Sequence, residues 1–208
     1  MTRKTIGLDD AYGLETPGDS VRLYADWAES YDEGFAREMD YRLPYAVADL
    51  FLDRAGPDDA PVLDVGAGTG LVAERLAGRP VDALDISDEM LAVAAAKGLY
   101  RRTIAGDLTA TLPIVDAGYG GVVSAGTFTH GHVGPEALPE LLRIARPGAL
   151  FALSINAAVF EAAGFRAALD ALEGRIAGLT LPETRIYGDR ARPDHAGDTA
   201  LVALFRKA

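Results

Sequence analysis

Three glycines at alternate positions, directly after a short apolar run, restrict the possible folds of this chain more than any other feature. The apolar run covers residues 61–65, the glycines are Gly66, Gly68 and Gly70, and an amphipathic stretch follows at 71–77. The run predicts a buried strand, and the stretch after the glycines predicts a helix. Glycine accepts positive φ angles and lets backbone approach a ligand without an intervening Cβ. We therefore expect a strand–loop–helix unit whose loop binds a ligand.

The same alternation of short apolar runs and amphipathic stretches continues along the chain. Further strands are expected at residues 81–86, 102–105, 121–125, 149–155, 185–187 and 199–205, and further helices at 88–97, 136–145 and 157–177. Ser87 suits the N-cap of the helix at 88–97, and Gly98 suits its end. Repeated strand–helix units imply right-handed crossovers and a parallel sheet. The predicted fold class is α/β, a three-layer Rossmann-like sandwich.

The 208 residues divide into a tail and one predicted domain. Residues 1–20 are polar and interrupted by glycine and proline, so we expect a flexible tail there. Residues 21–208 are expected to form a single domain, because their number is typical of one domain. Within it, a helical cap at 21–55 precedes a Rossmann-like core at 60–208.

Acidic residues around three predicted strands indicate what the glycine loop binds. The dinucleotide fingerprint is G-x-G-x-x-G, whereas this loop reads G-x-G-x-G, and Asp64 stands two residues before the first glycine. A carboxylate there would repel a phosphate and favour a cationic ligand. Asp85 ends the second strand 19 positions after Gly66, a distance that suits the hydroxyls of a ribose. Because Asp107 follows the third strand, all three acids converge with the loop on the crevice at the carboxyl ends of the strands.

These motifs together resemble class I S-adenosylmethionine-dependent methyltransferases. The resemblance rests on residues 63–70, Asp85-Ile86-Ser87, Asp107-Leu108 and Arg146-Pro147-Gly148. It extends over residues 21–155 and is weaker beyond them. Residues 24–32, Tyr41-Arg42 and 97–100 are more narrowly similar to the Williams–Beuren-region methyltransferase-like proteins.

The resemblance implies S-adenosylmethionine as the cofactor and S-adenosylhomocysteine as its product. The loop of Gly66, Ala67, Gly68 and Gly70 would carry the methionyl end, and Asp64 would support its ammonium group directly or through water.

The nucleoside end of the cofactor would meet the next two strands. Asp85 would bind both ribose hydroxyls, and Ile86 would pack on the adenine. Asp107 would accept a hydrogen bond from the adenine amino group, with Leu108 at the ring edge, and Ala125 would pass close to the sulfonium.

The resemblance also implies a sheet order and excludes some acceptors. The order is 3-2-1-4-5-7-6 over seven strands, consistent with residues 199–205 as an antiparallel strand. An Asn/Asp-Pro-Pro-Tyr/Phe motif marks the members that methylate amides and exocyclic amines. Residues 124–129 read Ser-Ala-Gly-Thr-Phe-Thr instead, so adenine-N6 and glutamine methylation are disfavoured.

An aromatic stripe lies before the glycine loop. Tyr24, Trp27, Ala28 and Tyr31 recur at the spacing of one helix face. Such a stripe either packs in the core or caps the cofactor, whose sulfonium an aromatic face attracts by ~0.5–2 kcal/mol. Tyr24 and Trp27 are the candidates for this contact.

His130 and His132 flank Gly131 just after the fourth strand and are the candidate catalytic residues. One of them would take a proton from an O–H or N–H acceptor, unless both make only local hydrogen bonds. Two histidines without a cysteine or a third nearby ligand make a poor zinc site, so no metal is expected. His195 follows Pro193-Asp194 and is expected in a turn without a catalytic role.

Composition narrows the class of partner. The chain carries 20 basic and 31 acidic residues, a net charge of −11, and no basic run longer than a pair, so no nucleic-acid partner is expected. No apolar run approaches the roughly 18 residues that cross a bilayer, and no secretory signal follows residues 1–4, so no membrane partner is expected. The chain has no cysteine, which permits a cytoplasmic localisation.

The sequence therefore predicts an enzyme that transfers the methyl group of S-adenosylmethionine to a small-molecule acceptor by in-line displacement. Residues 128–133 and 187–195 and the N-terminal helices are expected to build the acceptor pocket. Two alternatives stay open. One is a non-catalytic module that binds S-adenosylmethionine or S-adenosylhomocysteine; the other is an NAD(P)-dependent reductase, against which the glycine spacing and Asp64 both count.

Overall fold

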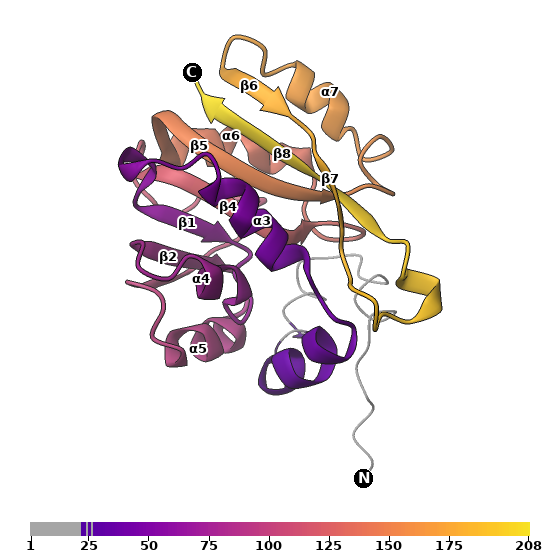
Figure 1. Cartoon of the computed structure of the whole chain (residues 1–208). Coiled ribbons are helices and arrows are strands. Elements are labelled where there is room, and N and C mark those ends of the chain that lie inside the picture. Colours follow the sequence, from indigo (N-terminus) through magenta and orange to yellow (C-terminus); the bar gives the residue numbers. More distant parts are fainter. Residues whose placement is uncertain (1–21, 24, 26) are drawn as a thin grey trace.

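The computed structural model describes residues 22, 23, 25 and 27–208 (Figure 1). The tail expected at residues 1–20 and the candidate Tyr24 lie outside the described residues.

Eight strands in this described part form one sheet, in the order β3-β2-β1-β4-β5-β8-β6, with β7 also paired to β8. The first five strands run parallel, and β8 is antiparallel to β5, β6 and β7. The strands are β1 (Val62–Val65), β2 (Val81–Asp85), β3 (Thr103–Ala105), β4 (Tyr119–Phe128), β5 (Ala145–Asn156), β6 (Ile176–Thr180), β7 (Glu183–Arg185) and β8 (Thr199–Lys207). The predicted α/β Rossmann-like fold is confirmed.

Short helices and turns connect these strands. The α-helices include α3 (Leu43–Leu52), α4 (Leu71–Arg75), α5 (Asp88–Ala96), α6 (Leu138–Ile144) and α7 (Phe165–Asp170). The 3-10 turns are Ala28–Ser30, Pro57–Asp59, Pro135–Ala137 and Pro193–His195, and Tyr31–Ala36 is a π-helix. The predicted N-cap is confirmed, because Ser87 Oγ accepts a hydrogen bond from Met90 N at 3.2 Å.

The C-terminal third differs from the prediction in two ways. The helix expected at residues 157–177 is reduced to α7, because residues 157–164 form turns and residues 176–180 pair with β8 as strand β6. The strand expected at 185–187 begins earlier, as β7, so two short strands stand where one was predicted. Strand pairing along β8 therefore overrides the helical pattern of this segment.

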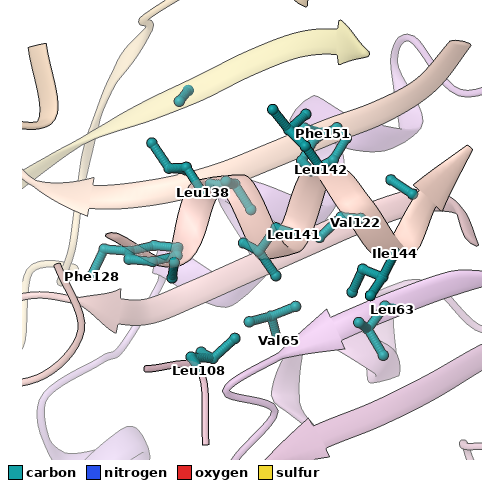
Figure 2. Packing of buried hydrophobic residues seen from close by; sticks show 14 of the residues in the cluster. Leu63, Val65, Leu108, Val122, Phe128, Leu138, Leu141, Leu142, Ile144 and Phe151 are labelled. Carbon is teal, nitrogen blue, oxygen red and sulfur yellow. The ribbon is translucent and has the colours of Figure 1, made fainter. Parts of the chain in front are cut away.

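Alternate side chains of the central strands point to opposite faces of the sheet, and helices cover both faces. Val122 packs with α6 in one core cluster, whereas its neighbour Val123 packs with α3 and α4 in another. In Figure 1, α3 crosses in front of the sheet and α6 is partly hidden behind β5. Figure 2 shows the first cluster, with Leu138, Leu141 and Leu142 of α6 beside Val122. These layers fix the sheet and leave the carboxyl ends of β1 to β4 for a ligand, since the strand order reverses between β1 and β4.

Candidate functional site

A cavity of about 1040 Å³, including the open space at its mouth, lies at the carboxyl ends of β1 to β4. Most of the predicted cofactor-binding residues line it: Gly66, Ala67, Gly68, Asp85, Ile86, Asp107, Leu108 and Ala125. Asp64, Gly70 and Trp27 do not line it. Segments far apart in the sequence thus meet at one edge of the sheet, as the spacing of the motifs predicts.

Gly66 and Gly68 shape the floor of this first cavity in different ways. Both have left-handed backbone, with φ angles of +63° and +52°. A Cβ on Gly66 would lie 2.0 Å from Thr127 Oγ1, so the loop packs tightly against the end of β4 there. A Cβ on Gly68 would meet no atom within 4 Å. Gly68 therefore presents bare backbone to the open cavity, which is where a ligand can approach most closely.

Asp85, at the end of β2, ties the glycine loop to the next helix. Its Oδ2 accepts a hydrogen bond from Gly68 N at 2.8 Å, and its Oδ1 accepts one from Ser87 N at 2.9 Å. Each carboxylate oxygen can accept a further hydrogen bond, so the group can still receive two hydroxyls from a ligand. Burial raises the pKa of Asp85, although the backbone N–H groups lower it.

Asp107 lies just past β3 and forms a local turn with Thr109. Its Oδ1 accepts hydrogen bonds from Thr109 N at 2.8 Å and Thr109 Oγ1 at 2.7 Å. This turn fixes the carboxylate at the wall of the first cavity, which Thr109 also lines.

Asp64 lies behind the loop rather than in the cavity wall. Its side chain is fully buried, and Oδ2 accepts a hydrogen bond from the Tyr100 hydroxyl at 2.6 Å. The other oxygen, Oδ1, is buried with no hydrogen-bond partner within the described residues. Burial raises the pKa of Asp64 to about 7, the charge of Asp85 raises it further, and the Tyr100 hydrogen bond opposes both. The predicted support of an ammonium group would therefore have to act from behind the loop.

Gly70 has a packing role that the sequence did not reveal. A Cβ at this position would lie 3.0 Å from the ring of Tyr100, the residue that holds Asp64. Gly70 thus makes room for the Tyr100–Asp64 pair and does not line the cavity.

Asp32 lies in the π-helix of Tyr31–Ala36 and joins this N-terminal segment to the glycine loop. Thr69 Oγ1 donates a hydrogen bond to Asp32 Oδ1 at 2.5 Å, and Lys97 Nζ lies 2.6 Å from Asp32 Oδ2. Lys97 also pairs with Glu74 at 2.7 Å. One carboxylate therefore holds the π-helix of Tyr31–Ala36 against both the loop and the end of α5.

A second cavity adjoins the first beneath the N-terminal segment. Tyr31, Tyr41, Gly126 and His132 line both cavities. Trp27 lines only the second cavity, so the structure does not bring it to the first, and its contact with the cofactor stays a prediction. The 3-10 turn at Ala28–Ser30 and the π-helix after it remove the regular helical spacing on which that prediction depended.

The two candidate histidines separate in the structure. His132 lines both cavities, whereas His130 lines neither. His132 Nδ1 lies 2.6 Å from the carbonyl oxygen of His130, and because a carbonyl only accepts, Nδ1 carries the proton. Nε2 is then the basic nitrogen. Burial lowers the pKa of His132, so the ring is neutral near pH 7. His195 lies in the predicted turn, with its Nδ1 2.9 Å from Asp198 Oδ2.

Several lining residues were not predicted as site residues. Thr127 and Met90 line the first cavity, and Phe35, Ser154 and Asn156 line the second. Thr127 lies near the carboxyl end of β4, and its place next to Ala125 and Gly126 in the sequence was the available signal. The residues of the second cavity come from distant segments and have no motif in common.

The described residues provide neither a helix that could cross a bilayer nor a cluster of metal ligands. No helix there is long and apolar enough to cross a bilayer. No group of three or more His, Cys, Asp or Glu side chains there could hold a metal ion.

Comparisons with known proteins agree with this geometry. Residues 63–153 match the family described as a methyltransferase domain. Over 150 residues the chain is 33% identical to methyltransferase-like protein 27 of Homo sapiens, a match that covers 69% of this chain and 60% of that protein. This relative confirms the resemblance to the Williams–Beuren-region proteins.

Two other proteins are similar over different extents. Malonyl-[acyl-carrier protein] O-methyltransferase of Pectobacterium atrosepticum is 41% identical over 95 residues, 45% of this chain and 37% of that protein. The chain thus spans less than two thirds of the length of either curated relative. A TehB-like SAM-dependent methyltransferase structure from Corynebacterium glutamicum has a TM-score of 0.57 at 23% identity, covering 93% of this chain and 100% of that one. At that identity the likeness shows the fold alone.

Proposed function

This chain carries a methyltransferase domain of the S-adenosylmethionine-dependent family, and from that premise we propose that it transfers the methyl group of S-adenosylmethionine to a small-molecule acceptor. The observation that carries the proposal is that Asp85 and Asp107 line one cavity together with Gly66 and Gly68. Two carboxylates at successive strand ends beside a bare glycine backbone suit a nucleoside attached to an amino acid.

The residues of the first cavity fit this cofactor. Asp85 retains acceptor sites for two ribose hydroxyls, and Asp107 is positioned to accept from an amino group of the base. Ile86 and Leu108 supply apolar walls for a planar ring between these acids. Gly68 leaves space for the methionyl backbone. An ammonium group at the loop would supply a donor near Oδ1 of Asp64, which is buried and has no hydrogen-bond partner among the residues that the structure describes.

The protein contributes alignment, exclusion of water and proton removal. S-adenosylmethionine, when bound, supplies a methyl group already activated by the positive charge of its sulfur. The π-helix of Tyr31–Ala36, which Asp32 holds against the glycine loop, contributes Tyr31 to the walls of both cavities. An acceptor in the second cavity would then face the first across Tyr41, Gly126 and His132, in line for displacement. His132 lines both cavities and is the residue that we propose takes a proton from the acceptor.

Calorimetry with S-adenosylhomocysteine tests the cofactor site. At about 100 times its dissociation constant, this ligand should stabilise the chain by ~2.7 kcal/mol, which raises the thermal midpoint by roughly 5–10 °C. Asp85→Asn should weaken its binding by about 10–100-fold, since hydrogen bonds to a charged acceptor are worth ~1.5–3 kcal/mol each. Asp53→Asn is the matched control, because Asp53 is exposed and lines neither cavity.

Three outcomes decide between the candidate functions. Binding of NAD or NADP without binding of S-adenosylhomocysteine would contradict the proposal and favour a reductase. Tight binding of S-adenosylhomocysteine without turnover over a metabolite mixture would favour a non-catalytic module. Formation of S-adenosylhomocysteine from S-adenosylmethionine over that mixture, detected by mass spectrometry and lost in Asp85→Asn, is the result that we expect.

A further inference from the structure

Two aspartates on the neighbouring strands β1 and β2 are fully buried, but their surroundings differ. Asp82 of β2 accepts hydrogen bonds from Arg101 at 2.8 Å, from Arg102 at 2.9 Å and from the Tyr119 hydroxyl at 2.7 Å. Burial raises the pKa of Asp82, but the hydrogen bonds from these three side chains outweigh it, so that pKa lies below its ordinary value. Asp64 of β1, by contrast, is paired with no Lys or Arg in the described part of the chain.

The carboxylate of Asp64 is an incomplete ion cluster. The Tyr100 hydroxyl donates a hydrogen bond to Oδ2 at 2.6 Å, whereas Oδ1 is buried and has no hydrogen-bond partner among the described residues. Burial raises the pKa of Asp64 to about 7, the Tyr100 hydrogen bond opposes this rise, and the charge of Asp85 adds to it. A buried carboxylate without a cation is costly, so the pair lacks the positive charge that Asp82 has. An ammonium group bound at the glycine loop would supply that charge.

Tyr100 contacts both ends of the glycine loop. Its hydroxyl binds Asp64, two residues before Gly66, and its ring lies 3.0 Å from the position of a Cβ on Gly70. Burial and the charge of Asp64 raise the pKa of Tyr100, so the phenol keeps its proton and is the donor in this bond. Rotation of the carboxylate would break the bond, and Tyr100 therefore fixes which oxygen of Asp64 stays available.

The charged groups around this pair are acidic. Asp85 at the end of β2 acts on both Asp64 and Tyr100, and Glu74 of α4 acts on Tyr100. Both carboxylates favour the protonated form of Asp64 or of Tyr100, because each adds negative charge nearby. A cation is therefore the kind of group that would stabilise the ionised form of Asp64.

We propose that Tyr100 is a positioning residue that holds the Asp64 carboxylate for the ammonium group of the cofactor, and that cofactor binding drives the proton of Asp64 into solvent. This inference rests on the proposed function, which supplies the cofactor. Because the pKa of Asp64 is about 7, the ligand-free carboxyl is protonated below that pH. A nearby ammonium group favours the ionised form. The O–H bond of the carboxyl then breaks, its electron pair stays on the carboxylate, and the proton passes to water.

Titration calorimetry of the wild-type chain counts this proton. S-adenosylhomocysteine, which carries the same ammonium group, is titrated in phosphate and in imidazole, two buffers with different ionisation enthalpies. The matched ligand is 5′-methylthioadenosine, which has the same nucleoside and sulfur without the amino-acid end, so it keeps any contribution of Asp85. At pH 6 we expect S-adenosylhomocysteine to release about one proton more than this ligand, and at pH 8 almost none more.

Affinity measured across pH tests the role of Tyr100. Below pH 7, Tyr100→Phe should bind S-adenosylhomocysteine at least about tenfold more weakly than wild type, because a hydrogen bond to the ionised carboxylate is lost. The ratio of the two dissociation constants should shrink to within about threefold by pH 9, since Asp64 is then ionised in both chains. A loss of packing alone would give the same ratio at every pH. Asp64→Asn should remove the difference in pH dependence between the two ligands.

Tyr119→Phe is the matched control. It also loses a hydroxyl that binds a buried aspartate, but Tyr119 lines neither cavity. Its affinity for S-adenosylhomocysteine should equal that of wild type at every pH. Thermal midpoints above the assay temperature verify that both phenylalanine variants are folded. If Tyr100→Phe does not fold, the proton count on wild type and Asp64→Asn still decides.

The inference is overturned if the two ligands release the same number of protons from wild type at pH 6. It is also overturned if Tyr100→Phe weakens both ligands by one factor that is the same at every pH, because Tyr100 then only supports the loop. In both cases S-adenosylhomocysteine still binds, and the proposed function stands. If S-adenosylhomocysteine does not bind wild type, the proposed function itself fails.

Discussion

Replacing Asp64 with asparagine should make the ligand-free chain more stable at neutral pH. The carboxyl of Asp64 is fully buried, and burial raises its pKa to about 7 from an ordinary value of 3.8. Asparagine has nearly the same shape and can still accept the hydrogen bond from the Tyr100 hydroxyl, but it never ionises. The substitution therefore removes the cost of a buried charge and keeps the contact.

The sign and size of the effect follow from proton linkage. Below about pH 4 the carboxyl is protonated in both states, so its ionisation does not affect stability. Between about pH 4 and 7 the unfolded chain is ionised while the folded chain keeps the proton, so the stability of wild type falls as pH rises. Over this range each pH unit lowers the free energy of unfolding of wild type by about 1.4 kcal/mol. The accumulated loss above pH 7 is therefore about 4 kcal/mol.

Urea unfolding of wild type and Asp64→Asn between roughly pH 5 and 8 measures this difference. The stability of the variant relative to wild type should rise by about 1.4 kcal/mol per pH unit up to pH 7 and then level off. Asp53→Asn, at an exposed position, should show no such rise. A difference between Asp64→Asn and wild type that is independent of pH would refute the reasoning, because the carboxyl would then titrate alike in both states.

Two further predictions concern the loop and the helix beside it. Gly66→Ala should lower stability by about 2 kcal/mol or more, since its Cβ would meet Thr127 Oγ1 at 2.0 Å and φ is +63°. Gly68→Ala should lower it by only about 1 kcal/mol and chiefly weaken S-adenosylhomocysteine binding, and equal unfolding free energies for the two variants would contradict this. Ser87→Ala should cost about 1 kcal/mol in urea unfolding, because Ser87 Oγ caps Met90 N at 3.2 Å; no loss would mean that another group replaces the cap.

Features encoded by local spacing could be predicted from the sequence. Residues that follow a parallel strand must lie at the carboxyl edge of the sheet, so Asp85 and Asp107 could be placed together with Gly68 before any coordinates. The sheet order was implied by the family resemblance rather than by the alternation of strands and helices, and the structure has one strand more than the seven expected. Which side of the loop Asp64 would occupy could not be predicted, because it depends on Tyr100, whose hydroxyl bonds to Asp64 from a position 36 residues later.

Features that depend on contacts formed only in the folded chain could not be predicted. The expected helix at residues 157–177 ends inside the segment 176–180, which pairs with β8 as a strand in the structure. The place of Trp27 depends on the 3-10 and π turns after it, whose hydrogen bonds leave no periodic signal. His130 and His132 were equivalent in the sequence, and the bond from His132 Nδ1 to the carbonyl of His130 made them different.

The division of the site between the sheet and the N-terminal segment has a consequence for how such a chain can be redesigned. The first cavity is built by residues at the strand ends, such as Gly68 after β1 and Asp85 at the end of β2. Much of the wall of the second comes from the aromatic side chains of Trp27, Phe35 and Tyr187. None of these three aromatic residues lines the first cavity. Under the proposed function, exchanging them would alter the size and shape of the acceptor space while the residues that line the donor cavity stay unchanged. Acceptor specificity and donor binding would then be separately adjustable, and a library confined to these three positions would sample new acceptors.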